Sequence, residues 1–302
     1  MKLLIVGISL ALLSAIACWL VVGGANPPAF NPSPNLEANR EYREGLMALH
    51  ERDDSLAAIG HFQAAIEKDP KFADAYARLA GAWISGSGAT NIPKARLAAE
   101  KAVLLNRKLA VAHSILATVK LHELNWAGAE KERTLALKSN PNSEEILLES
   151  ALNLAVMGKT NAALVILEKA HHANPDSASN VRVLLSGFVY AWCRQYDSAI
   201  EIYNQFPEGG AWMHEQHAQA CLAKGNYTNA MRLGKLAALE RGADSTQVNA
   251  EFDGLEKAFK QGGPRNYWEL KLEFEKAKNG ENHLMHLASI YARLNQPDKT
   301  FE

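Results

Sequence analysis

Cysteine is scarce in this chain. The three cysteines, Cys18, Cys193 and Cys221, form no C-x-x-C pair and no spacing typical of zinc ligands. The sequence therefore indicates neither a redox motif nor a structural zinc site. For Cys193 and Cys221 two alternatives stay open: a disulfide if this region is exported, or two buried thiols.

An excess of charge of either sign is also missing. The chain has 32 Lys and Arg against 33 Asp and Glu, a formal net charge of -1, and no long run of like charges. A surface that binds nucleic acid or acidic lipid needs clustered basic residues. We therefore expect no nucleic-acid partner.

Catalytic motifs are absent in a usable form. The stretch "HEQHAQAC", from His214 to Cys221, has H-E-x-H, whereas a zincin helix needs H-E-x-x-H to bring both histidines to one face. The stretch "SGSGATN" contains Gly86 and Gly88, but no strand precedes it, as a phosphate-binding loop would require. We expect no enzymatic activity, no cofactor and no metal.

One long hydrophobic run is present, at the N-terminus. Residues Leu3 to Val22 are uncharged, and as a helix they would extend about 30 Å, enough to cross a bilayer. This length favours an uncleaved membrane anchor, while small residues at Gly23 and Ala25 leave cleavage of a signal peptide, and hence secretion, as the alternative. Lys2 precedes the run, so the positive-inside rule predicts that the remainder lies outside the cytoplasm, anchored to the inner membrane.

The chain divides into three predicted segments. Residues 1–25 are the anchor or signal segment. Residues 26–38 are a linker that begins with "NPPAFNPSPN", whose four prolines disfavour helix and keep the backbone extended. Residues 39–302 form the folded region.

The folded region carries an internal repeat. "NWAGAEKERTLALKSNPNS" and "KTNAALVILEKAHHANPDS" share two alanines and an Asn-Pro pair at equal offsets, and Pro141 and Pro175 are 34 positions apart. From Leu36 onward, helix-length segments alternate with Gly, Asn or Pro, and almost no strand-like alternation occurs. A helix-turn-helix unit with this period is the pattern of tetratricopeptide repeats (TPR). We therefore predict an all-α superhelix, with an irregular helical bundle as the alternative.

The unit from Glu144 to Ser177 matches the TPR consensus best. Alanines occupy positions 8, 20 and 27, where the helices cross and a larger side chain would push their axes beyond about 8–10 Å. Gly158 and Pro175 occupy positions 15 and 32. Units starting at Ala110 and Ala211 repeat much of this pattern, and "ADAYARLAGAW" and "HLMHLASIYARLN" match its first helix. Because one unit cannot bury its apolar face alone, we expect about seven stacked helix pairs.

Two stretches depart from the repeat. The spacing slips between "CRQYDSAIEIYNQFPEGG" and the segment "ALERGADSTQVNAEFDGLEKAFKQGGPRNYWELKLEFEKA". The sequence also stops at "DKTFE", within what would be the second helix of the final repeat. We expect this last repeat to be truncated.

A closer resemblance comes from "DAYARLAGAW", "KARLAAEKAVLLNRKLAVAHSILATVK", "NWAGAEKERTLALKSNP" and "HLASIYARLNQPDKTFE". Together they resemble the membrane-tethered TPR region of bacterial winged-helix transcription regulators and of some serine/threonine kinases. The resemblance covers roughly Tyr42 to Glu302. It implies a bacterial sensory or scaffolding module without catalysis, and the sequence includes no output domain that matches those families.

The first helix of each repeat is expected to line a concave groove. Lys and Asn, which hold a terminal carboxylate in chaperone-binding TPR proteins, do not occupy positions 5 and 9, so that ligand is not expected. We predict a non-catalytic adaptor that binds a protein or peptide segment. The alternatives are a sensory fragment of a transmembrane regulator or kinase and, for the apolar groove positions, packing between neighbouring repeats. The candidate groove residues are Val111, Ser114, Thr118, His122, Glu145, Leu148, Leu152, Trp212, Glu215 and Gln219.

Overall fold

The computed structural model describes residues 32–52, 54–86, 91–175, 180–207, 209–277 and 283–296. Within these ranges every regular element is an α-helix. The chain divides between Arg194 and Gln195 into two compact units, called unit 1 and unit 2 below. The predicted all-α class is confirmed, as is the solenoid of paired helices.

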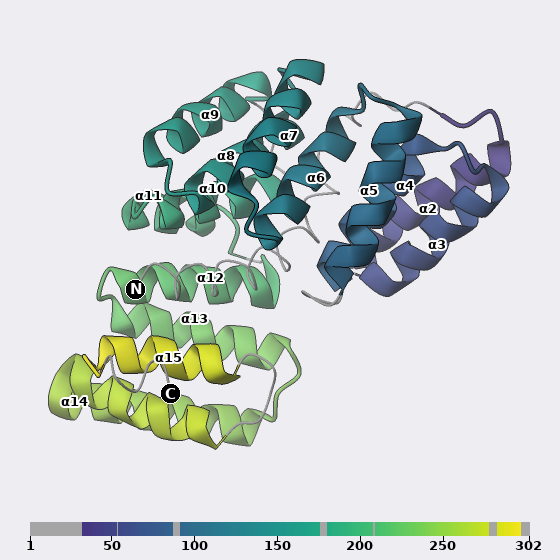
Figure 1. Ribbon diagram of the computed structural model, residues 1–302. Helices are drawn as coiled ribbons and strands as arrows, with labels where there is room; N and C mark the ends of the chain where they lie inside the picture. Colours follow the sequence, from purple (N-terminus) through teal and green to yellow (C-terminus); the bar gives the residue numbers. More distant parts are fainter. Residues whose placement is uncertain are drawn as a thin grey trace. The chain divides into compact units, whose positions relative to one another are not determined.

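Unit 1 is a row of helix pairs. The pairs are α2–α3, α4–α5, α6–α7 and α8–α9, and α10 follows them (Figure 1). From α4 onward the first helices also pack on one another, α4 on α6, α6 on α8 and α8 on α10. The helices span Leu36–Arg52 (α2), Ser55–Lys68 (α3), Ala73–Gly86 (α4), Ile92–Leu105 (α5), Ala110–His122 (α6), Trp126–Ser139 (α7), Glu144–Val156 (α8), Thr160–Ala173 (α9) and Asn180–Trp192 (α10).

The repeat positions that the sequence singled out behave as predicted. In unit 1 the small residues where helices cross are at most 1% exposed, so they let the helix axes approach closely. Position 15, between the two helices of a repeat, is left-handed in at least four repeats: φ is 57° at Leu124, 73° at Gly158, 79° at Gly225 and 57° at Asn295. Glycine reaches this conformation without strain, which explains its place in the consensus. The crossing residues are Ala80, Ala117, Ala129, Ala136, Ala151, Ala163 and Ala170.

The described structure begins inside the predicted linker. The Asn35 side chain accepts hydrogen bonds from the backbone of Glu37 and Ala38, so it caps α2, which starts at Leu36. Ser33 donates its hydroxyl to Asp69 at the end of α3 and ties this segment to the first helix pair. The predicted anchor, residues 1–25, lies outside the described residues. None of the described helices has both the length and the apolar character needed to cross a bilayer.

The described residues of unit 2 form five helices, one of them sharply broken. Inside α14, Gly263 has φ 65° and ψ -151°, and Pro264 follows it. Lys271 Nζ lies 2.8 Å from Glu251 Oε1, so the two halves of α14 fold back on each other as a further helix pair. This hairpin occupies the region in which the sequence spacing slips. The helices span Tyr196–Asn204 (α11), Gly210–Ala223 (α12), Tyr227–Glu240 (α13), Ser245–Lys276 (α14) and His283–Arg293 (α15) (Figure 1).

The two described cysteines are free thiols. Cys193 belongs to unit 1 and Cys221 to unit 2. Burial raises the pKa of both thiols. The sequence left open a disulfide or two buried thiols; the structure has two free thiols, of which Cys221 is buried and Cys193 only half-buried. The end of the predicted truncated repeat, from residue 297 onward, lies outside the described residues.

Candidate functional site

One face of α8 carries three polar side chains at intervals of four residues. Glu145, Glu149 and Asn153 therefore lie above one another on successive turns. Glu145 receives two hydrogen bonds from Arg78 of α4, with Nη1–Oε1 at 2.8 Å and Nη2–Oε2 at 3.5 Å. Because α4 and α8 both pack on α6, this ion pair spans the first helix of the intervening repeat.

A small network surrounds this ion pair. Asp74 lies one turn before Arg78 on α4, and Tyr42 of α2 interacts with the Arg78 guanidinium. Arg78 is only 2% exposed and Glu149 only 3% exposed. We call Tyr42, Asp74, Arg78, Glu145 and Glu149 the concave polar cluster, because they lie on the first helices α2, α4 and α8, and first helices line the concave side of a TPR solenoid.

Burial controls the electrostatics of this cluster. It raises the pKa of Asp74 to about 6 and that of Tyr42 to about 12. The pKa of Glu149 is raised well above its usual range, first by burial and then by the charge of Glu145. Three carboxyl groups thus share one guanidinium, and two of them hold protons more tightly than they would in water.

Several polar atoms here have no partner. Asp74 Oδ2, Glu149 Oε2 and Asn153 Nδ2 are shielded from solvent and make no hydrogen bond. Leaving such an atom unpaired costs about 1–3 kcal/mol, more if it is charged. Within the described residues the concave polar cluster therefore leaves two acceptors unused, on Asp74 and Glu149, and Asn153 beside it leaves a donor unused.

The predicted groove residues of α6 are largely enclosed. Val111, Ser114 and Thr118 are each at most 5% exposed, and the Thr118 hydroxyl donates to the Ser114 carbonyl of its own helix at 3.4 Å. His122 is half-buried. Burial lowers the pKa of His122 to about 4, so its ring is neutral near neutral pH.

The predicted groove leucines of α8 are also buried. Leu148 is 2% exposed and Leu152 is 1% exposed, and α8 packs against α6, α7, α9 and α10. A change of either leucine to aspartate would bury an unpaired charge and test folding rather than binding. Of the predicted residues on α8, Glu145 is the one that the structure connects to the polar cluster.

The remaining predicted groove residues lie on α12 in unit 2. Trp212 and Glu215 are half-buried and Gln219 is exposed. Glu215 forms an ion pair with Arg241 at the end of α13. The sequence prediction therefore falls into two sets, one in each unit.

The histidine of the zincin-like stretch has a structural role. His214 Nδ1 lies 2.8 Å from a Glu240 carboxylate oxygen, and Nε2 donates to the Pro207 carbonyl at 2.9 Å. His113 repeats this arrangement in unit 1, with Glu132 at 2.7 Å and the Arg107 carbonyl at 3.0 Å. Each histidine ties both helices of its repeat to the preceding turn. Both ring nitrogens of His214 are thereby occupied, and the described residues contain no group of three side chains placed to hold a metal.

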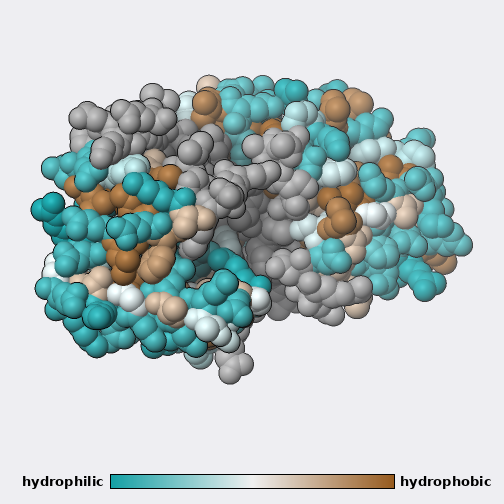
Figure 2. All heavy atoms as spheres, turned by 90° about the horizontal axis from the view of Figure 1, so that it is seen from below, coloured by the Kyte–Doolittle hydropathy of each residue, from teal (hydrophilic) through white to brown (hydrophobic). Residues whose placement is uncertain are grey.

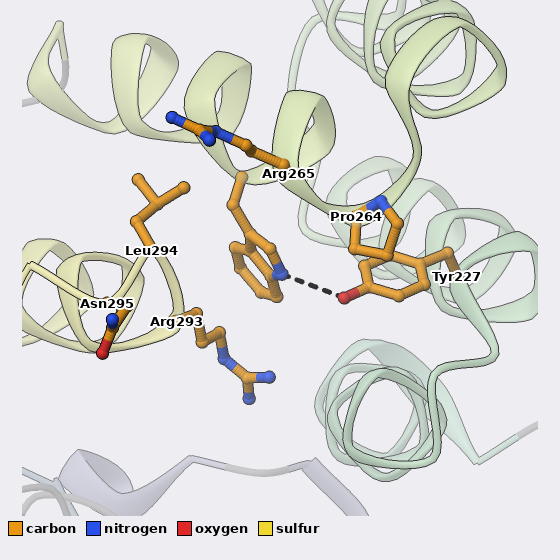
Figure 3. A pocket seen from close by; sticks show the side chains of 7 residues that line it. Tyr227, Pro264, Arg265, Arg293, Leu294 and Asn295 are labelled. Atoms are coloured by element: carbon orange, nitrogen blue, oxygen red, sulfur yellow. Dashed lines mark hydrogen bonds between the residues drawn. The ribbon is translucent and has the colours of Figure 1, made fainter.

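Unit 2 contains a separate open pocket of about 570 Å³. Tyr227 and Pro264 lie at one end and Leu294 and Asn295 at the other (Figure 3). The dashed line in Figure 3 is the hydrogen bond that Trp268 Nε1 donates to the Tyr227 hydroxyl at 3.0 Å. The indole nitrogen of Trp268 is thus already hydrogen-bonded. The two arginines that line the pocket, Arg265 and Arg293, are exposed to solvent.

On the face drawn in Figure 2, the described residues show a mostly hydrophilic surface. The hydrophobic residues on that face gather in small separate areas. Exposed large side chains occur on several helices, for example Leu56 on α3, Leu97 and Leu104 on α5, and Val165 on α9. Scattered exposure of this kind is normal for a protein surface and indicates no interface by itself.

The sequence did not identify most of the concave polar cluster. The predicted groove comprises positions 2, 5, 9, 12 and 13 of the repeat, whereas Arg78 and Glu149 both occupy position 6. A signal was present: α4 and α8 are mainly apolar helices, yet Asp74 with Arg78 and Glu145 with Glu149 place charged pairs four residues apart. Charges at this spacing share one helix face.

Comparison with known proteins supports the fold. No family model and no curated protein matches the sequence. Among solved structures, human IFIT1 in a dimer with PPP-AAAA is 17% identical and covers 87% of this chain and 70% of its own, with a TM-score of 0.56.

Two further structures have similar scores. The Cut9–Hcn1 complex of the APC/C is 16% identical, covers 72% of this chain and 43% of its own, and has a TM-score of 0.55. Yeast Tom70 is 16% identical, covers 95% of this chain and 63% of its own, and has a TM-score of 0.54. This chain therefore spans less than half of the Cut9–Hcn1 chain it matches. These neighbours include TPR proteins, and the likeness is one of fold: the chain has an all-α, TPR-like solenoid architecture.

Proposed function

We propose that unit 1 binds a segment of another protein along its first helices and acts as a non-catalytic adaptor. The observation that carries this proposal is the incomplete hydrogen bonding of the concave polar cluster. Glu149 Oε2, Asp74 Oδ2 and Asn153 Nδ2 are buried without partners. A polypeptide offers both N–H donors and C=O acceptors, so it can satisfy all three.

The architecture supports the same function. Successive first helices α4, α6, α8 and α10 pack side by side in unit 1 and form an extended surface. Stacked repeats of this kind have extended concave surfaces that suit elongated ligands. Tethering to a membrane through Leu3–Val22, on the outer side of the inner membrane, remains a prediction from the sequence and is a further part of the proposal.

The test is selection of short random peptides on the full-length chain, followed by hydrogen–deuterium exchange of the complex. We expect the bound peptide to slow exchange in α4, α6 and α8 more than in their partners α5, α7 and α9. Failure to select any binder, or protection confined to α5, α7 and α9 or to unit 2, would contradict the proposed groove.

The resemblance to regulators and kinases suggests a second arrangement, in which this region senses a ligand for an output domain. The structural neighbours named above do not bear on that idea. An in-frame upstream extension that encodes a winged helix or a kinase would support it. The adaptor function does not depend on this outcome.

A further inference from the structure

The concave polar cluster has more negative than positive groups. Glu145 accepts both hydrogen bonds from the Arg78 guanidinium, which neutralises one carboxylate. Asp74 and Glu149 remain, each with one buried oxygen that has no hydrogen-bond partner. When all three carboxyls are ionised, the cluster carries two uncompensated negative charges in a sheltered site.

We propose that this cluster recognises a basic side chain, lysine or arginine, on the protein segment that unit 1 binds. The inference rests on the proposed function and adds the chemistry of the partner. An ammonium or guanidinium brings a positive charge and several donors to a place with unused acceptors. Hydrogen bonds between charged groups are about twice as strong as neutral ones, and they are stronger still away from water.

The geometry of α8 indicates how such a segment would be held. The Glu149 carboxyl offers an unused acceptor, and one turn further along the same face Asn153 offers an unused Nδ2 donor. We expect Glu149 to take the basic side chain and Asn153 to donate to a backbone carbonyl of the same segment. One face of α8 would then select a basic residue in the bound segment through Glu149 and set the direction of that segment's backbone through Asn153.

The charged groups around this site favour a positively charged ligand. Tyr42, Asp74, Arg78 and Glu145 are its charged or titratable neighbours. On α6, the His122 ring is neutral near neutral pH, His113 pairs with Glu132 of α7, and Lys120 lies beside Gly128 of α7. An acidic ligand group would add a further negative charge to three carboxyls. A metal ion lacks a suitable site, because no set of three potential ligands converges among the described residues.

Binding of a cation to this cluster should be coupled to the release of protons from its carboxyl groups. Burial raises the pKa of Asp74 and of Glu149, so the empty cluster retains protons that exposed carboxyls would lose. A bound cation stabilises the ionised carboxylates and replaces those protons. Binding should therefore release protons and weaken as the pH falls below about 6, where the empty cluster is more fully protonated.

The experiment uses the selected peptides, the full-length chain and two variants. Glu149→Gln keeps the size of the side chain and removes its charge. Glu168→Gln makes the same change on the exposed side of α9 in the same repeat and serves as the matched control. Each protein is titrated with the peptide and with a version in which its basic residue is replaced by glutamine.

We expect the selected peptides to share a lysine or arginine, and Glu149→Gln to weaken their binding about ten- to a hundred-fold. Replacement of the basic residue should weaken binding to the wild-type chain by a similar factor, and it should add little to the loss caused by Glu149→Gln. Glu168→Gln should bind as wild type. Circular dichroism should show that Glu149→Gln folds normally, because the change removes an unpaired buried carboxyl.

The outcomes separate the two proposals. If peptides protect α4, α6 and α8 but contain no preferred basic residue, or if Glu149→Gln binds them unchanged, the cluster does not recognise a cation, although the groove still binds. If no peptide protects these helices, the proposed function fails and this inference fails with it. If Glu168→Gln weakens binding as much as Glu149→Gln, the effect is one of net charge and the site is refuted.

Discussion

The buried ion pair of Arg78 and Glu145 gives a stability prediction with a definite size. The Arg78 side chain is 3% exposed and that of Glu145 is 13% exposed, and their closest atoms are 2.8 Å apart. Two charges about 4 Å apart attract by about 4 kcal/mol at an effective dielectric constant near 20. Arg78→Met removes this attraction but leaves three carboxyls in the cluster. We therefore expect a loss of about 3–5 kcal/mol in the free energy of unfolding.

The double variant Arg78→Met, Glu145→Met should behave differently. It removes the pair together, and replacement of a buried pair by apolar side chains is often neutral or stabilising. Its stability should lie within about 2 kcal/mol of the wild-type chain, so the coupling energy between the two positions should exceed about 1–2 kcal/mol.

Urea denaturation followed by circular dichroism measures the free energies. Hydrogen exchange of peptides from α4 and α8 assigns the change to unit 1, because unit 2 contributes to the same optical signal. A loss below about 1 kcal/mol for Arg78→Met, or two single effects that simply add in the double variant, would refute the view of a tightly coupled buried pair.

Three further predictions test other parts of the structure. Burial raises the pKa of Asp74 to about 6, so its contribution to stability is full below about pH 4 and is lost as the pH rises through about 6, by up to about 3 kcal/mol. Asp74→Asn should remove this dependence, and parallel stability–pH curves for the two proteins would contradict the shift. Gly158→Ala places a methyl group at a φ of 73° and should lower the free energy of unfolding by about 1–2 kcal/mol. Gly60→Ala lies in open space on helix α3 and should raise it by about 0.5–1 kcal/mol. Urea midpoints that move in the same direction for both variants would contradict this prediction. His214→Leu strands the Glu240 carboxylate and the Pro207 carbonyl and should cost about 1–3 kcal/mol in a thermal or urea unfolding assay, so an unchanged stability would argue against the structural role of this histidine.

Much of the fold could be predicted from the sequence, because a repeat constrains it many times over. The same small residues recur wherever two helices cross, and Ala151 and Ala163 are buried as their positions require. The turn at Gly158 follows from the need for a left-handed residue between paired helices. These are local requirements, and a local pattern can reveal them.

Other features depend on contacts that no local pattern specifies. The hairpin inside α14 follows from Gly262, Gly263 and Pro264, but the consensus spacing gives no guide to which helices its halves meet. The division between Arg194 and Gln195 is likewise a property of packing between repeats.

The candidate site was harder to predict for a related reason. The groove positions were assigned from one repeat at a time, and each helix was treated as if its concave side were open. In the structure, α8 packs against four other helices, so Leu148 and Leu152 are buried. This agrees with the alternative that apolar groove positions pack between repeats. The link from Arg78 to Glu145 joins residues 67 positions apart and cannot be read from either repeat alone.

Stability alone does not explain why charges occupy this place. Apolar side chains at Arg78 and Glu145 would avoid the free-energy cost of removing two charges from water. Glu149 adds a carboxyl that has no cationic partner of its own and whose Oε2 makes no hydrogen bond. A buried group of this kind lowers stability unless something else completes it. Glu149 lies beside a neutralised pair on a first helix of unit 1 and leaves a buried acceptor unused, which is what a binding site for a cationic side chain requires.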